Sequence, residues 1–222
     1  MLPLIIVFGL FIAWVALSFL YWFLVRPWHL RWGATDREVR QSFPGDELTS
    51  PHPKLNATHA ITINAPAADV WPWLVQVGQN RGGFYSYTWL ENLVGCHMRN
   101  ADRIVPEWQK LEVGDRVWLH PKAPPLKVLM LEPGRSIVLE KTWAFFLRSM
   151  DERTTRLIIR GRGDYNPAMK NSIFNFLLWR LIFEPAHFIM ERRMLLGIKQ
   201  RAEAAVRRHN EERPTSGFAA VH

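Results

Sequence analysis

Residues 58–74, THAITINAPAADVWPWL, combine the periodicity of a strand with that of a helix. His59, Ile61 and Ile63 alternate with small or polar residues, which is typical of a half-buried strand. The pair Ala65-Pro66 ends this strand, and Asp69 favours the start of a helix just after it. A strand that leads directly into a short helix therefore opens the folded part of the chain. The helix is expected to carry Val70, Trp73, Leu74 and Val77.

The chain after this opening predicts a second short helix, a run of strands and a long final helix. The second helix is expected from Ser86 to Val94. The connections between the strands are short, and short connections favour antiparallel neighbours. From Ala186 to Arg208 apolar residues recur every three or four positions, which indicates an amphipathic helix. The expected strands are Arg116–His120, Leu126–Leu131, Ile137–Lys141, Trp143–Arg148 and Thr154–Arg162.

The amino-terminal segment predicts a transmembrane helix. From Pro3 to Val25 there are 23 residues without a charge, and 15 of them are Leu, Ile, Val or Phe. A helix of this length reaches roughly 34 Å, enough for a hydrocarbon core of about 30 Å. A cleaved signal peptide would need a basic start, a shorter apolar run and a small-residue cleavage site, and this segment has none of them. Basic residues follow the run, so the positive-inside rule predicts an inner-membrane protein whose remainder is cytoplasmic. These residues are Arg26, Arg31, Arg37 and Arg40.

We divide the chain into four parts by its composition. They are a transmembrane anchor at 1–25, a tether at 26–56, one folded α+β domain at 57–209 and a disordered tail at 210–222. Within the domain, the apolar run Phe174–Phe183 is too short to span a bilayer. We expect this run to dip into the membrane interface or to cover an opening of the domain.

Four further segments accompany the opening at Ala60–Leu74: Gly83-Phe84-Tyr85-Ser86, Trp89-Leu90-Glu91-Asn92, Asn100-Ala101-Asp102-Arg103-Ile104 and Glu184-Pro185-Ala186-His187-Phe188. With them, the chain from about Lys54 to Glu203 resembles the SRPBCC, or START-like, superfamily, which includes polyketide cyclase/dehydrase-like proteins. The later segments resemble an uncharacterised, membrane-anchored bacterial subgroup of it.

This resemblance implies a helix-grip fold, in which a curved antiparallel sheet wraps the long final helix and leaves an apolar cavity. It also implies binding of a lipid, a polyketide or another hydrophobic molecule. The superfamily has no shared catalytic set, so the resemblance assigns no catalytic residue. Aromatic and methionine side chains line adaptable apolar pockets. We therefore expect the ligand to be bound by Tyr85, Trp89, Trp108, Trp143, Phe145, His187, Met190 and Met194.

Motifs for cofactor, metal or nucleophilic chemistry are weak, and we expect no cofactor and no metal. The sequence has no nucleophile elbow, phosphate loop or dinucleotide fingerprint. Glu184 and His187 form one Glu-x-x-His pair, whereas a di-iron site needs two such pairs and further glutamates. Cys96 is the only cysteine, so the chain has no internal disulfide and no cysteine-based zinc cluster. A carboxylate held against apolar walls could act as a general acid or base, or equally form an ordinary ion pair. The candidates are Glu91, Asp102 and Glu107.

The net charge of +8 favours a negatively charged partner. Arg156, Arg160 and Arg162 alternate along one strand and could meet phosphates. No nucleic-acid recognition module is visible, so we expect these arginines to face the anionic leaflet and expect no nucleic acid as a partner.

Three functions remain open on the sequence. The first is membrane-tethered binding or transfer of a hydrophobic small molecule or lipid at the cytoplasmic face. The second is a cyclase or dehydratase that acts on a polyketide-like substrate through Asp102, Glu107 or His187. The third is a non-enzymatic accessory subunit of a membrane-protein complex, with its pocket collapsed.

Overall fold

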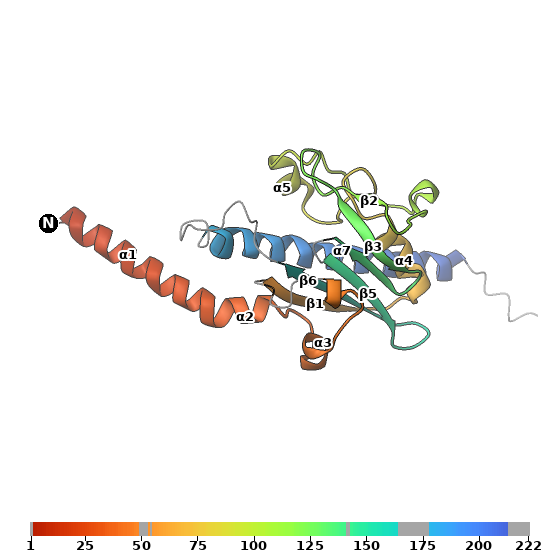
Figure 1. The fold of residues 1–222 in the computed structure, drawn as a ribbon, viewed down its shortest axis with the longest axis horizontal. Coiled ribbons are helices and arrows are strands. Elements are labelled where there is room, and N and C mark those ends of the chain that lie inside the picture. Colours follow the sequence, from red (N-terminus) through yellow and green to blue (C-terminus); the bar gives the residue numbers. More distant parts are fainter. Residues whose placement is uncertain (1, 49–52, 54, 141–142, 164–177, 213–222) are drawn as a thin grey trace, which may run out of the picture.

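The computed structural model describes residues 2–48, 53, 55–140, 143–163 and 178–212. Its centre is an antiparallel sheet of six strands in the order β1-β6-β5-β4-β3-β2. The long helix α7 lies against this sheet (Figure 1). The predicted α+β helix-grip fold, preceded by an apolar helix, is thereby confirmed. The strands are β1 (Leu55–Ile63), β2 (Arg116–Val117), β3 (Leu126–Glu132), β4 (Ser136–Leu139), β5 (Trp143–Ser149) and β6 (Thr155–Gly163).

Helices precede the sheet, follow its first strand and end the described chain. The first three helical segments, α1, η1 and α2, are continuous. The helices are α1 (Leu2–Leu20), the π-helical turn η1 (Tyr21–Val25), α2 (Arg26–His29), α3 (Asp36–Arg40), η2 (Asp46–Leu48), α4 (Ala67–Val75), α5 (Thr88–Leu93), η3 (Pro106–Trp108), the π-helical turn η5 (Trp179–Phe183) and α7 (Glu184–Glu212).

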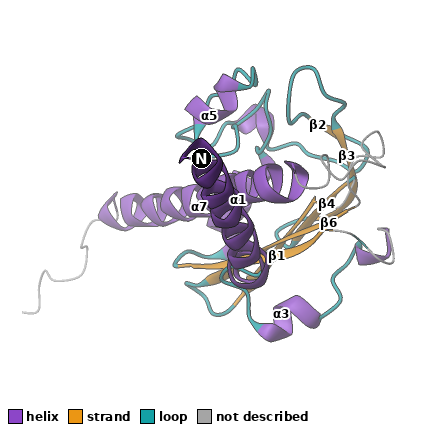
Figure 2. Ribbon diagram, turned by 90° about the vertical axis from the view of Figure 1, so that its left-hand side faces the viewer, coloured by secondary structure: helices purple, strands orange, loops and turns teal. Residues whose placement is uncertain are grey.

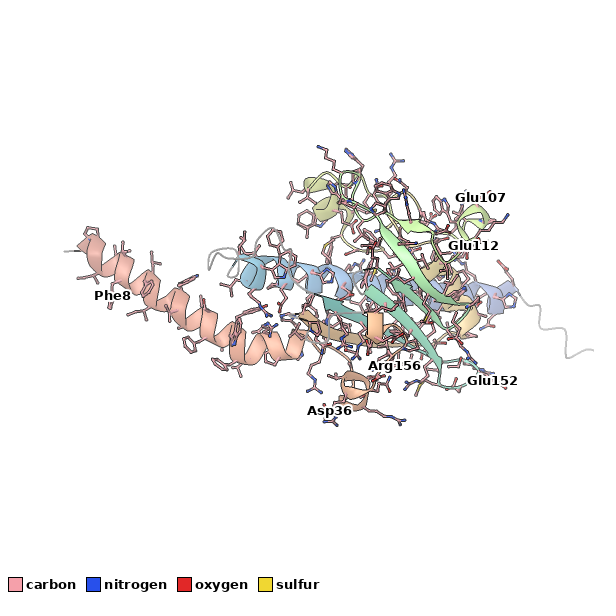
Figure 3. All side chains as sticks on the ribbon, in the orientation of Figure 1. Phe8, Asp36, Glu107, Glu112, Glu152 and Arg156 are labelled. Carbon is pink, nitrogen blue, oxygen red and sulfur yellow. The ribbon has the colours of Figure 1, made fainter. Side chains whose placement is uncertain are left out.

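The amino-terminal helix projects away from the folded domain. The stretch Ile5–His29 is long and apolar enough to cross a membrane, and its most apolar part is not buried against the domain. Phe8 points away from the helix axis into open space (Figure 3). By length and composition, this helix satisfies the requirement for a membrane span.

The sheet is buried on both faces. On the α7 side, Phe145, Leu157 and Ile159 pack in a core with Leu195 and Ile198 of α7. On the outer side, a second core contains Phe43, Ala60, Val138, Ala144, Phe146 and Ile158. Because both faces are covered, β4 and β5 carry consecutive apolar residues instead of an alternating pattern.

The outer face is covered by part of the segment predicted to be a tether. Leu30 and Trp32 accept backbone hydrogen bonds from Thr58 and Ala60 of β1, at 2.8 and 3.1 Å. Figure 2 shows α3 on the side of the sheet opposite α7. The segment at 26–48 therefore contains short helices that pack on the domain, which its breaker-rich composition did not predict.

Three arginines predicted to face the leaflet are instead held by this segment. Both guanidinium nitrogens Nε and Nη2 of Arg156 lie 2.8 Å from the carboxylate of Glu38. Arg160 and Arg162 each lie 3.1 Å from Asp46. Figure 3 shows Arg156 at the sheet above the helix that carries Asp36. Glu38 and Asp46 thus pair with all three arginines within the chain, and these contacts give no support to the expectation that the arginines face the anionic leaflet.

Several boundaries differ from the sequence prediction; for example, the expected helix Ser86–Val94 is shortened to α5, and Val77 lies beyond the end of α4. The expected strand Arg116–His120 is shortened to β2, because the chain turns at 119–122. The helix α7 continues to Glu212, so residues 210–212 of the predicted tail are helical. The rest of that tail, and the part of the Phe174–Phe183 run before Leu178, lie outside the described residues.

Candidate functional site

Glu191 lies at the centre of a buried polar cluster between α7 and the sheet. Its Oε2 lies 2.6 Å from Nδ1 of His59 on β1, and its Oε1 accepts a 2.7 Å hydrogen bond from Nε1 of Trp143 on β5. His187, one turn earlier in α7, places Nε2 3.8 Å from Oε2. Glu191 and His59 are buried, Trp143 is half-buried and His187 is exposed. The Glu191 cluster, defined by these four residues, therefore extends from the interior to the surface.

His59 carries a proton on both ring nitrogens. Nδ1 faces the carboxylate of Glu191, and Nε2 lies 2.7 Å from the carbonyl oxygen of His29. Both of these oxygens only accept hydrogen bonds, so both nitrogens of His59 donate and the ring is an imidazolium. Burial on its own lowers the pKa of His59, but the charge and hydrogen bond of Glu191 outweigh it and raise the pKa above its ordinary value of 6.5. Burial likewise opposes ionisation of Glu191, yet His59 brings the pKa of the carboxyl down to about 2.

The ion pair makes the stability of the domain depend on pH. The pKa of His59 is raised on folding, so its contribution is complete below about pH 6.5 and is lost as the pH rises through the raised pKa. The pKa of Glu191 is lowered, so its contribution is present above about pH 4.5 and is lost as the pH falls toward 2. We expect thermal unfolding in detergent to show its highest midpoint in this interval, with a fall toward alkaline pH. Histidine NMR signals should show one ring that stays protonated at neutral pH, and this ring should be absent from His59→Phe.

A second cluster of charged residues joins the anchor to α7. Glu184 Oε1 lies 2.7 Å from Nε of Arg26, and Glu184 Oε2 accepts a 2.9 Å hydrogen bond from Arg180. His29 Nε2 lies 3.6 Å from Glu184 and 2.9 Å from the hydroxyl of Tyr21. We call Tyr21, Arg26, His29, Arg180 and Glu184 the Glu184 cluster. Through these contacts the end of the apolar helix is fixed to the start of α7.

The aromatic ring of Phe188 contacts both clusters, which are also linked directly by the hydrogen bond from His59 to the carbonyl oxygen of His29. It is buried, and its centroid lies 5.1 Å from that of His29 and 5.4 Å from that of His59. Trp28 and Trp32 meet its edge at 5.5 and 6.4 Å. Glu184 and Glu191 are about two turns apart in α7, and Phe188 lies between them along the helix.

The two helices that meet at Glu184 begin with similar sequences, each directly after a π-helical turn. Arg26-Pro27-Trp28-His29 follows the π-helical turn η1, and Glu184-Pro185-Ala186-His187 follows the π-helical turn η5. Proline has no N–H to give to the carbonyl four residues earlier, which interrupts the α-helical bonding pattern. The preceding N–H groups, of Arg26 and Glu184, bond five residues back, to Tyr21 and Trp179. Arg26 and Glu184, which form an ion pair, therefore each lie directly after one of the two π-helical turns.

The two faces of the sheet differ in how closely they are packed. On the α7 side, the described side chains form a continuous core that includes Met194, Leu195 and Ile198. On the outer side, a cavity of about 190 Å³ is lined by Phe43, Pro44, Glu132, Arg135, Ser136, Phe146, Leu147, Arg148 and Ile158. Ligand pockets usually measure about 300–1,000 Å³, so this outer cavity is small for a lipid-sized molecule.

Comparison with known proteins gives distant structural matches. No protein-family model and no curated protein matches the chain. It is similar to a Polyketide_cyc-like protein from Corynebacterium glutamicum solved by NMR, with 16% identity and a TM-score of 0.29 over 76% of this chain and 100% of that one. It is also similar to a conserved protein of unknown function from Enterococcus faecalis, with 11% identity and a TM-score of 0.33 over 70% and 85% of the two chains. The helix-grip description rests on the strand order and α7, and membership of the SRPBCC superfamily stays a prediction.

The structure brings some of the predicted ligand-binding residues together and separates others. Trp143 and His187 meet at Glu191, and Phe145 packs 4.8 Å from the Trp143 ring. Tyr85, Phe145 and Met194 are buried in the core on the α7 side. Met190 is half-buried, and its carbonyl oxygen accepts a hydrogen bond from Ser86. Trp89 is 68% exposed on α5, and Trp108 lies in η3, where its carbonyl oxygen is bonded by Arg81. The ligand-binding role of all eight residues stays a prediction.

Sequence reasoning did not predict the contacts of either cluster. His59 was counted only as part of a strand, and Glu191 and His29 were not singled out. Arg26 was noted only for the positive-inside rule and Glu184 only for a weak metal motif. One available signal was a histidine on the apolar face of a strand, because a buried ionisable side chain needs a partner. Another was Glu191 one turn after His187, on the same face of an amphipathic helix.

The acidic residues considered for catalysis differ in their surroundings. Asp102 and Glu107 are exposed. Glu91 is buried, neither of its oxygens has a hydrogen-bond partner, and burial raises the pKa of this carboxyl to about 7. Burial, followed by the nearby Glu91 charge, raises the pKa of the Cys96 thiol, which disfavours the reactive thiolate. Among the described residues, no group of three or more His, Cys, Asp or Glu side chains could hold a metal ion.

Proposed function

We propose that the protein is a membrane-anchored helix-grip protein that binds a hydrophobic or lipid-like molecule beside the bilayer. The ligand would bind at the anchor end of α7, against the packed core, where Trp143, His187 and Met190 are not fully buried. The half-buried Trp143 and Met190 would contact its apolar part, and His187 its polar end. The transmembrane anchor, its cytoplasmic orientation and the ligand class all belong to this proposal.

The observation that carries the proposal is the Glu191 cluster. Small-molecule sites are mostly apolar with a few well-placed polar groups, and the interior around α7 has this composition. Trp143, Phe84 and Phe145 form an aromatic group beside the carboxylate. The exposed His187 adds a donor or acceptor at the surface end of the cluster.

The position of this cluster relative to the apolar helix also supports the proposal. The carbonyl oxygen of His29, the last residue of α2, accepts a hydrogen bond from His59 of the Glu191 cluster. The mouth of the site would therefore lie close to the headgroups if α1 spans the bilayer. Three apolar side chains near the start of α7 are about half-exposed and could contact acyl chains. They are Ile182 and Phe183 of η5 and Ile189 of α7.

Mass spectrometry of the purified full-length protein tests ligand binding. The protein should retain a lipid-like molecule from membrane extract in a fixed ratio after detergent exchange. Trp143→Ala should lose most of it, because the aromatic wall is removed. Trp118→Ala serves as the matched control, since it removes the same side chain directly after β2 and outside the eight predicted ligand-binding residues, and it should keep the ligand. Absence of any retained molecule from the unmodified protein counts against the proposal.

Alkaline extraction of membranes tests the anchor. Ile12→Arg places a charge mid-span, which costs about 2.5–3.5 kcal/mol of insertion free energy. We expect the extraction-resistant fraction to fall for Ile12→Arg and to stay unchanged for Leu48→Arg, where an exposed apolar residue outside the span is replaced. Equal extraction of both variants and the unmodified chain would exclude a membrane span at 5–29.

A second candidate function is that of an accessory subunit in a membrane complex. The observation that favours it is the packed core on the α7 side, where Met194, Leu195 and Ile198 are buried against the sheet. Blue-native electrophoresis after mild solubilisation separates the two functions. A discrete high-mass band without retained ligand supports the accessory role, and a monomer with ligand supports the binding role.

A further inference from the structure

The strongest unassigned feature is the apolar surface of α5. Trp89, Leu93 and Val94 are exposed by 68%, 75% and 65%, and Tyr87 just before the helix by 36%. Trp89 and Leu93 are four residues apart in the helix, so they share one face. Neighbouring exposed apolar side chains on a soluble surface are uncommon and mark interaction sites. We define Tyr87, Trp89, Leu93 and Val94 as the α5 surface.

Basic residues surround the α5 surface. The guanidinium of Arg193 lies 5.7 Å from the centroid of the Tyr87 ring. His97 and Arg99 are exposed in the segment that folds back on α5, where Asn92 makes two hydrogen bonds with the backbone of Met98. His120, two residues before the exposed Lys122, bonds the carbonyl oxygen of Val94 at 3.1 Å.

The stretch of chain that carries the α5 surface exposes no negative charge. Between Val70 and Ala101 the only acidic residue is Glu91, and its side chain is 4% exposed. A tryptophan-containing apolar helix with a basic rim has the composition of segments that lie in the interface of anionic membranes.

The α5 surface lies at the end of the domain from which the apolar helix projects. Figure 1 shows α5 at the same end as α2 and the start of α7, and Figure 2 views this end with α1 toward the reader. Other exposed apolar side chains of this end, Trp28, Ile182 and Phe183, belong to the segments beside α1. The bilayer that would hold α1 is therefore the partner in reach of α5.

We propose that the α5 surface docks onto the anionic leaflet that α1 enters, as a second membrane contact that fixes the orientation of the domain. Trp89, Leu93 and Val94 insert at the level of the headgroups, and the basic rim meets lipid phosphates. This inference rests on the anchoring part of the proposed function and is independent of whether a ligand is bound. A domain held at two points cannot rotate freely about the anchor, so the Glu191 cluster keeps one orientation relative to the bilayer.

A fluorescent label at position 93 tests this docking. The full-length protein, with Cys96→Ala to leave a single thiol, carries Leu93→Cys or the control Met150→Cys, both labelled with an environment-sensitive dye. Met150 is 60% exposed in the turn near Glu152, which lies at the opposite end of the domain (Figure 3). The vesicles contain phosphatidylcholine alone or equal parts of phosphatidylcholine and phosphatidylglycerol, with lipid-borne quenchers. In the anionic vesicles, quenching at position 93 should be several-fold stronger than at position 150.

Each result has one interpretation. Equal quenching at the two positions overturns the proposal. Shielding of the dye at position 93 without quenching by lipid also overturns it, and indicates that a protein partner covers the α5 surface instead. Flotation of the same vesicles reports α1 attachment separately, so loss of the anchor is distinguished from loss of docking. Arg99→Glu with Lys122→Glu should reduce quenching at position 93 in anionic vesicles several-fold. The control Arg135→Glu, which changes a 75% exposed side chain in the β3–β4 turn, should not.

Discussion

Replacing Glu191 with alanine is expected to lower the free energy of unfolding by about 3–5 kcal/mol, because removal of one partner leaves a buried charge unpaired. The group left behind is His59, which is almost entirely buried and whose other nitrogen is bonded to the carbonyl oxygen of His29. Its Nδ1 is left either with an unpaired charge or, after loss of the proton, without a hydrogen-bond partner. The substitution also removes the acceptor for Trp143 Nε1. For a chain of this size the loss corresponds to a fall in the thermal midpoint of roughly 6–20 °C, measured by circular dichroism in detergent.

Glutamine at position 191 should be tolerated far better than alanine. If His59 gives up its Nδ1 proton, the amide N–H₂ can donate to that nitrogen while the amide oxygen accepts from Trp143. Every buried polar group then keeps a partner, and the expected loss is less than about 2 kcal/mol. The alkaline decline in stability should also disappear in Glu191→Gln, because no group with a raised pKa remains in the pair.

Two further variants control for the local effect of substitution. His187→Ala removes an exposed side chain 3.8 Å from Glu191, and exposed ion pairs contribute at most about 1 kcal/mol. In His59→Ala with Glu191→Ala both charges are absent, so the combined loss should be smaller than the sum of the two single losses. Additive losses, or an alanine variant as stable as the glutamine variant, would show that His59 and Glu191 do not form an ion pair.

Local patterns made most of the fold predictable. At 58–74 the spacing of apolar residues changes from every second residue to every third or fourth, which predicts a strand followed by a helix. Both β1 and α4 form in this stretch. The short turns between strands gave the antiparallel order β3 to β6. The outer layer was missed although its signal was present. The runs Ile137-Val138-Leu139 and Ala144-Phe145-Phe146 are apolar on both faces of their strands, which requires a cover on each side.

The polar clusters could not be derived from the sequence in the same way. His59 and Glu191 are separated by 132 positions, and only the docking of α7 on β1 brings them together. The same holds for Arg26 and Glu184, which meet because each follows a wide helical turn. Composition showed an excess of positive charge but not its partners, and Arg156, Arg160 and Arg162 are paired within the chain with Glu38 and Asp46.

The contact between α7 and the segment before α5 gives the second large expected effect. Gly197 lies in the buried middle of α7, and a Cβ added there would lie 2.8 Å from Cβ of Tyr85 and still closer to the Tyr85 carbonyl oxygen. Tyr85 has a positive φ of 54° and is held by hydrogen bonds from its N–H to Asn100 and from its hydroxyl to Trp73. The backbone at position 85 therefore has little room to retreat.

Gly197→Ala should consequently destabilise the domain although alanine favours helices. The gain in helix propensity is about 1 kcal/mol, whereas overpacking against a fixed backbone costs up to about 3 kcal/mol, occasionally more. We expect a net loss of about 2–3 kcal/mol, which is a fall of roughly 4–12 °C in the thermal midpoint.

The matched control for this substitution is Gly161→Ala in β6. The nearest atom to its added Cβ is Cβ of Ala57 at 4.0 Å, an ordinary contact, and alanine should leave stability unchanged or slightly higher because glycine weakens strands. If both alanine variants unfold at the same temperature, α7 does not pack against Tyr85 as described. If only Gly197→Ala unfolds early, the close approach of α7 to the backbone of Tyr85, in the segment before α5, contributes to holding α7 in place.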